Sequence, residues 1–221
     1  MCGIFGFVSN RIENAGEILV KGIGRLEYRG YDSVGLAVLN GSITVKKEVG
    51  TVEQFKRLNN YSELKAKIAI AHSRWSTHGG VTKENSHPHL SCNGDIAVVH
   101  NGIIENYAEL KKELIAKGHI FKSGTDTEVV PHLIEEYEKT EKFEMAIRKA
   151  LHQLKGSYAF LIINSNKKDE LIAVKYRSPL VLGISERMVL AASDPVPILE
   201  YTDRVVSVSY THLTLPTTPY V

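Results

Sequence analysis

The feature that most constrains the fold stands at the start of the chain, where Met1-Cys2-Gly3 runs directly into the apolar stretch 4–8. An apolar run without polar alternation is typical of a strand that is covered on both faces. A chain of 221 residues can bury a core large enough to cover such a strand. The sequence therefore predicts a buried strand with Cys2 at its N-terminal end.

Cys2 becomes the first residue if Met1 is removed, and its thiol and a free α-amine then belong to the same residue. Their reference pKa values, about 8.5 and about 7.7–8.0, let the amine accept the thiol proton near neutral pH. An N-terminal amine is a known base for an adjacent nucleophile. Position alone also permits the alternative that Cys2 is a small buried hydrophobe.

Composition and charge exclude several classes of protein. Lys plus Arg is 27 against 25 for Asp plus Glu, which offers no basic surface for nucleic acid. The two cysteines are too few for a disulfide framework. The chain lacks an apolar run long enough to span a membrane, and its N-terminus lacks the order of a signal peptide. We expect a cytoplasmic protein with no nucleic-acid or membrane partner.

Hydrophobic periodicity predicts helices clustered between two batches of mostly hairpin-linked strands, which indicates a layered α+β fold. Asn40-Gly41 joins the clearest hairpin. Thr125 and Glu128 resemble a capping box that opens a helix, and a strand is expected to stop at Asn101-Gly102. The expected helices cover about 14–27, 52–58, 105–117, 125–137 and 143–154, and the later strands 34–39, 43–48, 67–72, 96–100, 157–163, 170–175, 180–184, 188–192 and 204–206.

Residues 207–221 fit none of these patterns. This stretch has neither periodicity nor a face that could join a core, and it resembles translated adaptor sequence. We therefore expect one domain over 1–206, truncated at its C-terminal end, followed by a non-native or disordered tail. The alternative is a genuine C-terminus rich in proline and threonine.

Asn101-Gly102 is also a candidate oxyanion site. The side-chain amide and the following backbone N–H can point together at one developing negative charge. Asn-Gly is equally a common turn dipeptide, and the residues alone favour the turn.

Arg74 and Asp126 have the charges that complement an α-amino acid. Arg74, at the start of the aperiodic stretch 73–92, can hold a carboxylate with its planar guanidinium, and Asp126 can hold an ammonium group. Asp126 can instead cap a helix or supply negative charge at its N-terminus. Arg29 either orients the N-terminal site or pairs with Asp32 on the surface.

The nine histidines raise the question of a metal site. His87-Pro88-His89 and the stretch 72–78 bring histidines close in sequence, but neither has a cysteine or carboxylate at zinc-ligand spacing. Gly22, Gly24 and Gly30 lack the strand-loop-helix setting of a phosphate-binding loop. We therefore expect neither a metal nor a cofactor.

Six motifs in one order resemble the glutaminase domain of the glucosamine-6-phosphate synthase family. These synthases are class II glutamine amidotransferases with the N-terminal-nucleophile hydrolase fold, and the resemblance covers the chain from Met1 to about Val206. It implies a four-layer αββα sandwich of two antiparallel sheets. The motifs are Cys2-Gly3-Ile4, LEYRGYDS (26–33), AHSRWSTHG (71–79), HPH (87–89), VVHNGIIEN (98–106) and SGTDTEVV (123–130).

The resemblance also implies roles for individual residues. Cys2 matches the nucleophile, and Asn101 with Gly102 matches the oxyanion hole. Arg74 and Asp126 match the groups that hold the carboxylate and the amine of glutamine. The further matches are Thr77 and His78 lining the site, Trp75 in a mobile loop that covers glutamine, Arg29 beside the site, and His87 and His100 in supporting positions.

The implied reaction is hydrolysis of L-glutamine to glutamate and ammonia through a γ-glutamyl thioester on Cys2. In the family a C-terminal sugar-isomerase half binds fructose 6-phosphate and uses the ammonia to make glucosamine 6-phosphate; that half is absent from this chain. Two alternatives stay open. The chain can be an inert glutamine-binding fragment that retains Met1, or a glutaminase domain that serves a different acceptor synthase.

Overall fold

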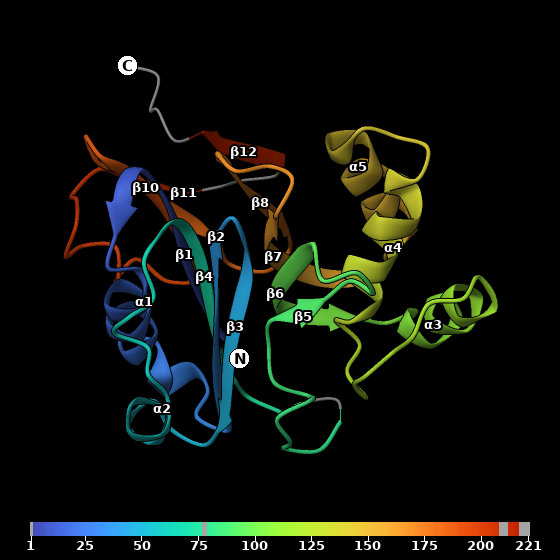
Figure 1. The fold of residues 1–221 in the computed structure, drawn as a ribbon, viewed down its shortest axis with the longest axis horizontal. Helices are drawn as coiled ribbons and strands as arrows, with labels where there is room; N and C mark the ends of the chain where they lie inside the picture. The colour runs from blue at the N-terminus through green and yellow to red at the C-terminus, as the bar shows by residue number, and fades with distance from the viewer. Residues whose placement is uncertain (1, 77–78, 208–211, 217–221) are drawn as a thin grey trace.

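The computed structural model describes residues 2–76, 79–207 and 212–216, and these residues form four layers (Figure 1). A seven-stranded and a five-stranded antiparallel sheet lie face to face, with helices on the outer side of each. The first sheet has the order β11 (Val205–Ser207), β9 (Val181–Ile184), β10 (Met188–Ala192), β1 (Gly3–Glu13), β4 (Ala66–Arg74), β2 (Ser33–Asn40), β3 (Ser42–Val49). The second has the order β12 (His212–Pro216), β8 (Glu170–Tyr176), β7 (Gly156–Asn164), β6 (Ile96–Ile104), β5 (His89–Leu90).

The helices fall into two groups that cover different sheets (Figure 1). The first group packs on the seven-stranded sheet, and the short 3₁₀ helix η1 (Glu27–Arg29) lies between its two helices in the chain. The second group packs on the five-stranded sheet. The first group is α1 (Ala15–Gly24) and α2 (Val52–Leu58), and the second is α3 (Tyr107–Ala116), α4 (Val129–Glu138) and α5 (Phe143–Gln153).

The central strand β1 shows why the N-terminal stretch lacks polar alternation. Ile4 and Val8 point into the core between the two sheets, whereas Phe5 and Phe7 pack under α1. All four side chains are fully buried. The prediction of a strand covered on both faces is confirmed, as is the α+β sandwich of two antiparallel sheets.

Most predicted elements are present with boundaries shifted by a few residues. The hairpin of β2 and β3 turns at Gly41, whose φ is +76°, and α2 begins at a Thr51–Gln54 capping box. Arg74 is the last residue of β4, so the strand extends two residues into the aperiodic stretch 73–92, where the sequence predicts a loop. These elements could be predicted from the sequence because helical periodicity and turn residues are local signals.

The prediction that a strand stops at Asn101-Gly102 is wrong. β6 continues to Ile104 and pairs with β7 along its whole length, with Asn101 opposite Ala159 and Gly102 opposite Tyr158. Gly102 has a φ of +148°, a conformation that L side chains rarely adopt. Asn-Gly therefore serves here as a distortion inside a strand and not as a turn.

The predicted capping box of Thr125 and Glu128 is also wrong. Helix α4 begins at Val129, and the Glu128 carboxylate accepts hydrogen bonds from the backbone N–H groups of Lys122 and Ser123. Pro131 thus lies in the first turn, where a missing N–H costs no helical hydrogen bond. Asp126 lies ahead of the helix and does not cap it.

The C-terminal residues add one strand to each sheet. β11 pairs with β9, and β12 pairs with β8 from His212 opposite Val174 to Pro216 opposite Glu170. The remaining tail residues, 208–211 and 217–221, lie outside the described part of the chain. The domain boundary near 206 and the non-native origin of the tail remain predictions.

Candidate active site

Strand pairing places Cys2 next to Arg74 and Trp75. Gly3 pairs with Ser73 across β1 and β4, so the residue before Gly3 meets the residues after Ser73. The Cys2 Sγ accepts a hydrogen bond from the Trp75 N–H at 3.4 Å and lies 3.5 Å from the Trp75 carbonyl oxygen. The pairing of β1 with β4 therefore holds the Cys2 thiol, which precedes β1, against Trp75, which follows β4.

Burial raises the pKa of the Cys2 thiol above its ordinary value. The Trp75 N–H and the charge of Arg74 act in the opposite direction, while the negative charge of Asp126 adds to the rise. Since the attacking form of a cysteine is the thiolate, this thiol needs a base to become reactive near neutral pH. Met1 lies outside the described residues.

Cys2 opens into a small hollow between the two sheets. Its lining comes from segments that are far apart in the sequence: the N-terminus, the end of β4, the stretch before β5, β6, and the segment before α4. The lining residues are Cys2, Arg74, Trp75, His87, His100, Gly102, Thr125, Asp126 and Thr127.

Arg74 and Asp126 both reach this hollow, and each is already held by backbone groups. The Arg74 guanidinium donates to the carbonyl oxygens of Gly80 at 3.0 Å and Gly79 at 3.3 Å. The Asp126 Oδ2 accepts the Ile104 N–H at 2.8 Å. A buried cation and a buried anion thus face the same hollow with fixed orientations, as the two charged ends of an α-amino acid require.

Asn101 and Gly102 are placed next to the hollow by β6. Gly102 lines it, and Asn101 is buried with its Nδ2 unpartnered among the described residues. Ala97 and Val99, which alternate with Asn101 along the strand, point into the core between the sheets. A buried amide donor without a partner is uncommon and requires an explanation.

Buried imidazoles form the floor beside these residues. The Thr127 hydroxyl lies 3.0 Å from His87 Nε2 and 2.8 Å from His100 Nδ1, and His72 Nε2 lies 2.8 Å from the His100 carbonyl oxygen. Burial lowers the pKa of His72 to about 3 and that of His100 to about 4, and it lowers the pKa of His87 well below its ordinary value. These rings are therefore neutral at physiological pH.

Arg29 lies beside the nucleophile candidate. Its Nε donates to the Cys2 carbonyl oxygen at 3.4 Å, and its Nη1 lies 3.6 Å from the Asp194 carboxylate. Asp32 accepts the Ser76 N–H instead. Of the two alternatives for Arg29, contact with the N-terminal site is the one that the structure shows.

Trp75 is 44% exposed at the rim, where Tyr31 meets it edge-on with ring centroids 5.7 Å apart. Thr77 and His78, which the resemblance places in the lining, lie outside the described residues. Sequence reasoning missed Thr127 and Asp194. Both contact residues distant in sequence, so the sequence assigned neither of them a role, although Thr127 lies within the motif at 123–130.

Comparison with protein families decides the class of the chain. The model of a glutamine amidotransferase domain matches residues 72–200. The chain belongs to this glutamine amidotransferase domain family. The match includes Arg74, Gly102 and Asp126, which line the hollow, and Asn101, which precedes Gly102 on β6.

Curated relatives of this amidotransferase domain are close in sequence and much longer. Glutamine–fructose-6-phosphate aminotransferase [isomerizing] of Methanococcus maripaludis is 50% identical over 91% of this chain and 34% of its own length. The enzyme of that name from Thermococcus kodakarensis is also 50% identical, over 93% of this chain and 34% of its own length. The chain spans about a third of the length of these curated relatives.

Solved structures share the fold of this amidotransferase domain. Glutamine phosphoribosylpyrophosphate amidotransferase from B. subtilis aligns over all of this chain and 50% of its own, with a TM-score of 0.82 and 27% identity. A structure described as the allosteric regulatory enzyme of purine biosynthesis aligns over the same shares with a TM-score of 0.84 and 28% identity. In the described part of this chain, no helix has the length and apolar character to cross a membrane.

Proposed function

We propose that this amidotransferase domain hydrolyses L-glutamine to glutamate and ammonia with Cys2 as the nucleophile. The observation that supports it most strongly is the shared hollow, where a thiol, a cation and an anion from distant segments meet at the end of β1. A cysteine with an amino-acid clamp and a nearby unpartnered amide donor fits acyl transfer from an amino acid.

The first chemical step forms a carbon–sulfur bond. With Met1 removed, the α-amine of Cys2 accepts the thiol proton and the thiolate attacks the side-chain carboxamide carbon of glutamine. Asn101 Nδ2 and the Gly102 N–H donate to the tetrahedral oxyanion. The intermediate then collapses, the amine returns the proton to the leaving nitrogen, and ammonia departs to leave the γ-glutamyl thioester.

Water completes the cycle. It attacks the thioester carbonyl carbon, the carbon–sulfur bond breaks, and glutamate leaves as the thiol is restored. Arg74 holds the α-carboxylate and Asp126 holds the α-ammonium throughout, so the reacting amide stays in line with Cys2. Trp75 covers the bound substrate, Arg29 fixes the backbone of Cys2, and Thr77 and His78 complete the lining.

The acceptor of the ammonia is proposed to be fructose 6-phosphate, bound by a sugar-isomerase half in a longer protein. The relatives at 50% identity carry that substrate in their names, and this chain matches about a third of their length. The phosphoribosylpyrophosphate enzyme matches at 27% identity, which favours the sugar phosphate over that acceptor.

The decisive measurement is glutamate release from glutamine by purified full chain whose mass has been determined. We expect activity once the mass shows loss of Met1, little activity while Met1 is retained, and none for Cys2→Ala after the same processing. The proposal is wrong if Cys2→Ala releases glutamate at the wild-type rate. Equal rates before and after removal of Met1 would eliminate the α-amine as the base.

A further inference from the structure

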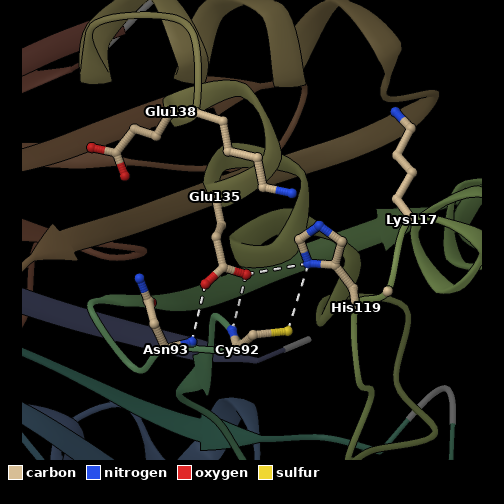
Figure 2. A pocket seen from close by; sticks show the side chains of 8 residues that line it. Cys92, Asn93, Lys117, His119, Glu135 and Glu138 are labelled. Atoms are coloured by element: carbon tan, nitrogen blue, oxygen red, sulfur yellow. Dashed lines mark hydrogen bonds and ion pairs between the residues drawn. The ribbon is translucent and has the colours of Figure 1, made fainter.

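A second group of reactive side chains lies on the helical side of the five-stranded sheet, outside the glutamine site. Cys92 stands in the turn between β5 and β6, His119 between α3 and α4, and His132 and Glu135 one turn apart on α4. One donor atom from each, the Cys92 Sγ, an imidazole nitrogen of each histidine and a Glu135 oxygen, lies within 4.8 Å of all the others. Figure 2 shows Cys92, His119 and Glu135 converging at one end of a surface hollow.

Four of the six distances between these donor atoms lie close to the edge lengths of a zinc tetrahedron. Zn–S bonds of about 2.3 Å and Zn–N or Zn–O bonds of about 2.0–2.1 Å give donor separations of about 3.4–3.6 Å. The Cys92 Sγ lies 3.6 Å from His119 Nδ1 and 3.4 Å from His132 Nδ1. The Glu135 Oε2 lies 3.2 Å and 3.7 Å from the same two nitrogens.

His119 has an outer carboxylate partner, as metal-binding histidines usually do, and a second carboxylate lies near His132 beyond hydrogen-bond reach. His119 Nε2 lies 3.0 Å from the Glu136 Oε2, and His132 Nε2 lies 3.6 Å from the Glu128 Oε1. A carboxylate hydrogen-bonded to Nε2, as that of Glu136 is in His119, favours the tautomer whose Nδ1 lone pair can bind a metal. The two rings thus present their Nδ1 atoms to the same point.

Backbone groups hold the other two donors in place. The Glu135 carboxylate accepts the Cys92 N–H at 3.1 Å and the Asn93 N–H at 3.0 Å, as Figure 2 shows. The Cys92 Sγ accepts the Ile120 N–H at 3.4 Å. These bonds orient the donors without using all of their lone pairs, which is the arrangement expected of a preformed site.

Burial and charge also suit a cation. His119 and His132 are buried, whereas Cys92 is exposed and lines the hollow, so an ion can enter from solvent. A Cys92 thiolate and the Glu135 carboxylate together neutralise a divalent ion. One sulfur, two imidazole nitrogens and one oxygen form a donor set that suits zinc.

We propose that Cys92, His119, His132 and Glu135 bind one Zn²⁺ in a tetrahedral structural site. Binding releases the Cys92 thiol proton to solvent and forms four bonds from the protein to the ion. The expectation of no metal rested on ligand spacing in the sequence. Donors from three separate segments leave no such spacing, so the sequence alone did not reveal them.

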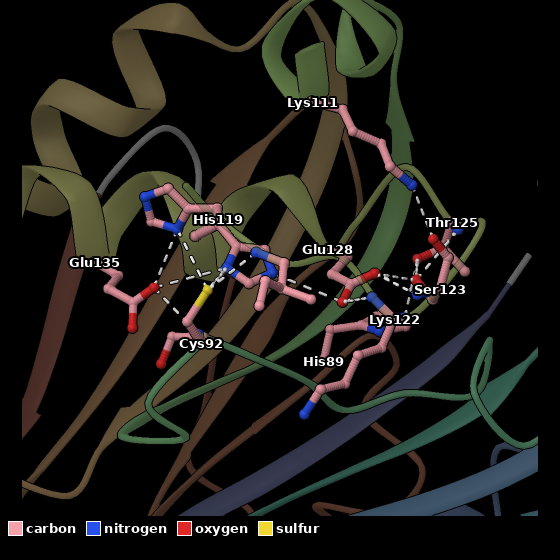
Figure 3. A network of polar contacts seen from close by, with 12 residues as sticks. His89, Cys92, Lys111, His119, Lys122, Ser123, Thr125, Glu128 and Glu135 are labelled. Atoms are coloured by element: carbon pink, nitrogen blue, oxygen red, sulfur yellow. Dashed lines mark hydrogen bonds and ion pairs between the residues drawn. The ribbon is translucent and has the colours of Figure 1, made fainter. Parts of the chain in front are cut away.

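The site is connected to the segment that carries Asp126. Glu128, which backs His132, accepts from the Lys122 N–H and from the Ser123 N–H and hydroxyl. Figure 3 shows this network continuing from Ser123 to Thr125, whose hydroxyl meets His89 Nε2 at 3.0 Å. Zinc would hold this segment in place, and any effect on glutamine binding rests on the proposed function.

Metal binding is therefore tested without reference to glutamine. The full chain is stripped with a chelator and titrated with Zn²⁺ and with Co²⁺. We expect one ion per chain, and for Co²⁺ the ligand-field bands of a tetrahedral site with a thiolate-to-metal charge-transfer band. Glu136→Gln should weaken Co²⁺ binding by about 10-fold or more. Glu135→Gln and Cys92→Ser should weaken it further, with folding checked by circular dichroism.

The chain contains two cysteines, which gives a matched control. Cys2→Ser should keep both the stoichiometry and the charge-transfer band, and this result assigns the thiolate to Cys92 even if Cys92→Ser fails to fold. Zn²⁺ should also raise the unfolding temperature of Cys2→Ser as it does for the wild type. The proposal is overturned if no ion binds at micromolar concentration, or if the band disappears in Cys2→Ser.

Discussion

Asn101 has a buried side-chain amide nitrogen that lacks a hydrogen-bond partner in the described part of the chain, and a bound ligand could supply one. Its amide nitrogen is buried without a partner among the described residues, which costs stability, yet it stands beside a hollow that also contains the candidate nucleophile. In the proposed mechanism this donor pairs with the negative charge that develops on the substrate during the reaction. The structural cost and the proposed catalytic benefit therefore belong to the same atom.

Asn101→Ala separates those two effects. Loss of an oxyanion donor should lower kcat for glutamine hydrolysis about 10²–10³-fold with little change in KM. The free energy of unfolding should change little, because relief of the unpaired donor offsets the packing that is lost with the side chain. Steady-state kinetics and urea unfolding test both parts, with the exposed Asn60→Ala as control. A large loss of stability with unchanged kcat would assign Asn101 a purely structural role.

Asp126→Asn probes the clamp for the ammonium group. Asparagine retains an oxygen that can accept the Ile104 N–H, so the backbone contact survives while the negative charge is lost. A hydrogen bond to a charged group contributes about 1.5–3 kcal/mol, so KM for glutamine should rise about 10–100-fold. Kinetics with glutamine measure this change. An unchanged KM would show that Asp126 does not contact the substrate amine.

At the scale of elements, local signals predicted most helices and strands, and the failures share one cause. The strand end at Asn101-Gly102 and the capping box at Thr125 and Glu128 were inferred from short motifs. Pairing with β7 overrides the first, and hydrogen bonds from Lys122 and Ser123 to Glu128 override the second. In both cases contacts with residues outside the short motif decided the structure: strand pairing with β7 in the first, and hydrogen bonds five and six residues away in the second.

Gly102→Ala tests the distortion of β6. An added Cβ would lie 2.0 Å from the Ser157 carbonyl oxygen at a φ of +148°, so the strand must shift. We expect a loss of unfolding free energy of about 2–3 kcal/mol or more. Gly94→Ala is the matched control, since Gly94 has a φ of +79° with nothing within 4 Å. It should cost about 1 kcal/mol. If urea unfolding gave equal losses of unfolding free energy for Gly102→Ala and Gly94→Ala, the close approach of Gly102 to the Ser157 carbonyl oxygen would not be the cause.

At the scale of the molecule, buried histidines join the two sheets. His72 on β4 reaches the carbonyl oxygen of His100 on β6, and His72 stacks on His87 with ring centroids 4.0 Å apart. A family resemblance could place His87 and His100 near the site. The sequence could not show that they are neutral and buried, because that depends on how the two sheets pack.

This packing makes stability depend on pH. Burial sets the pKa of folded His72 to about 3 and of folded His100 to about 4, below the unfolded value of about 6.5. Between these values the unfolded chain binds more protons than the folded one, so unfolding free energy rises with pH. The stabilisation of the folded state by these neutral histidines is complete above about pH 6.5. It is lost as the pH falls towards 4, the pKa of folded His100, and then towards 3, the pKa of folded His72.

Each of these histidines contributes a slope of up to about 1.4 kcal/mol per pH unit, so the wild type should lose on the order of 2–4 kcal/mol between about pH 7 and about pH 5. Urea unfolding at a series of pH values measures this loss. His72→Gln should reduce the slope, whereas His152→Ala, which changes an exposed histidine on α5, should preserve it. If the unfolding free energy of the wild type did not change with pH, water would reach these rings and the two sheets would not bury them.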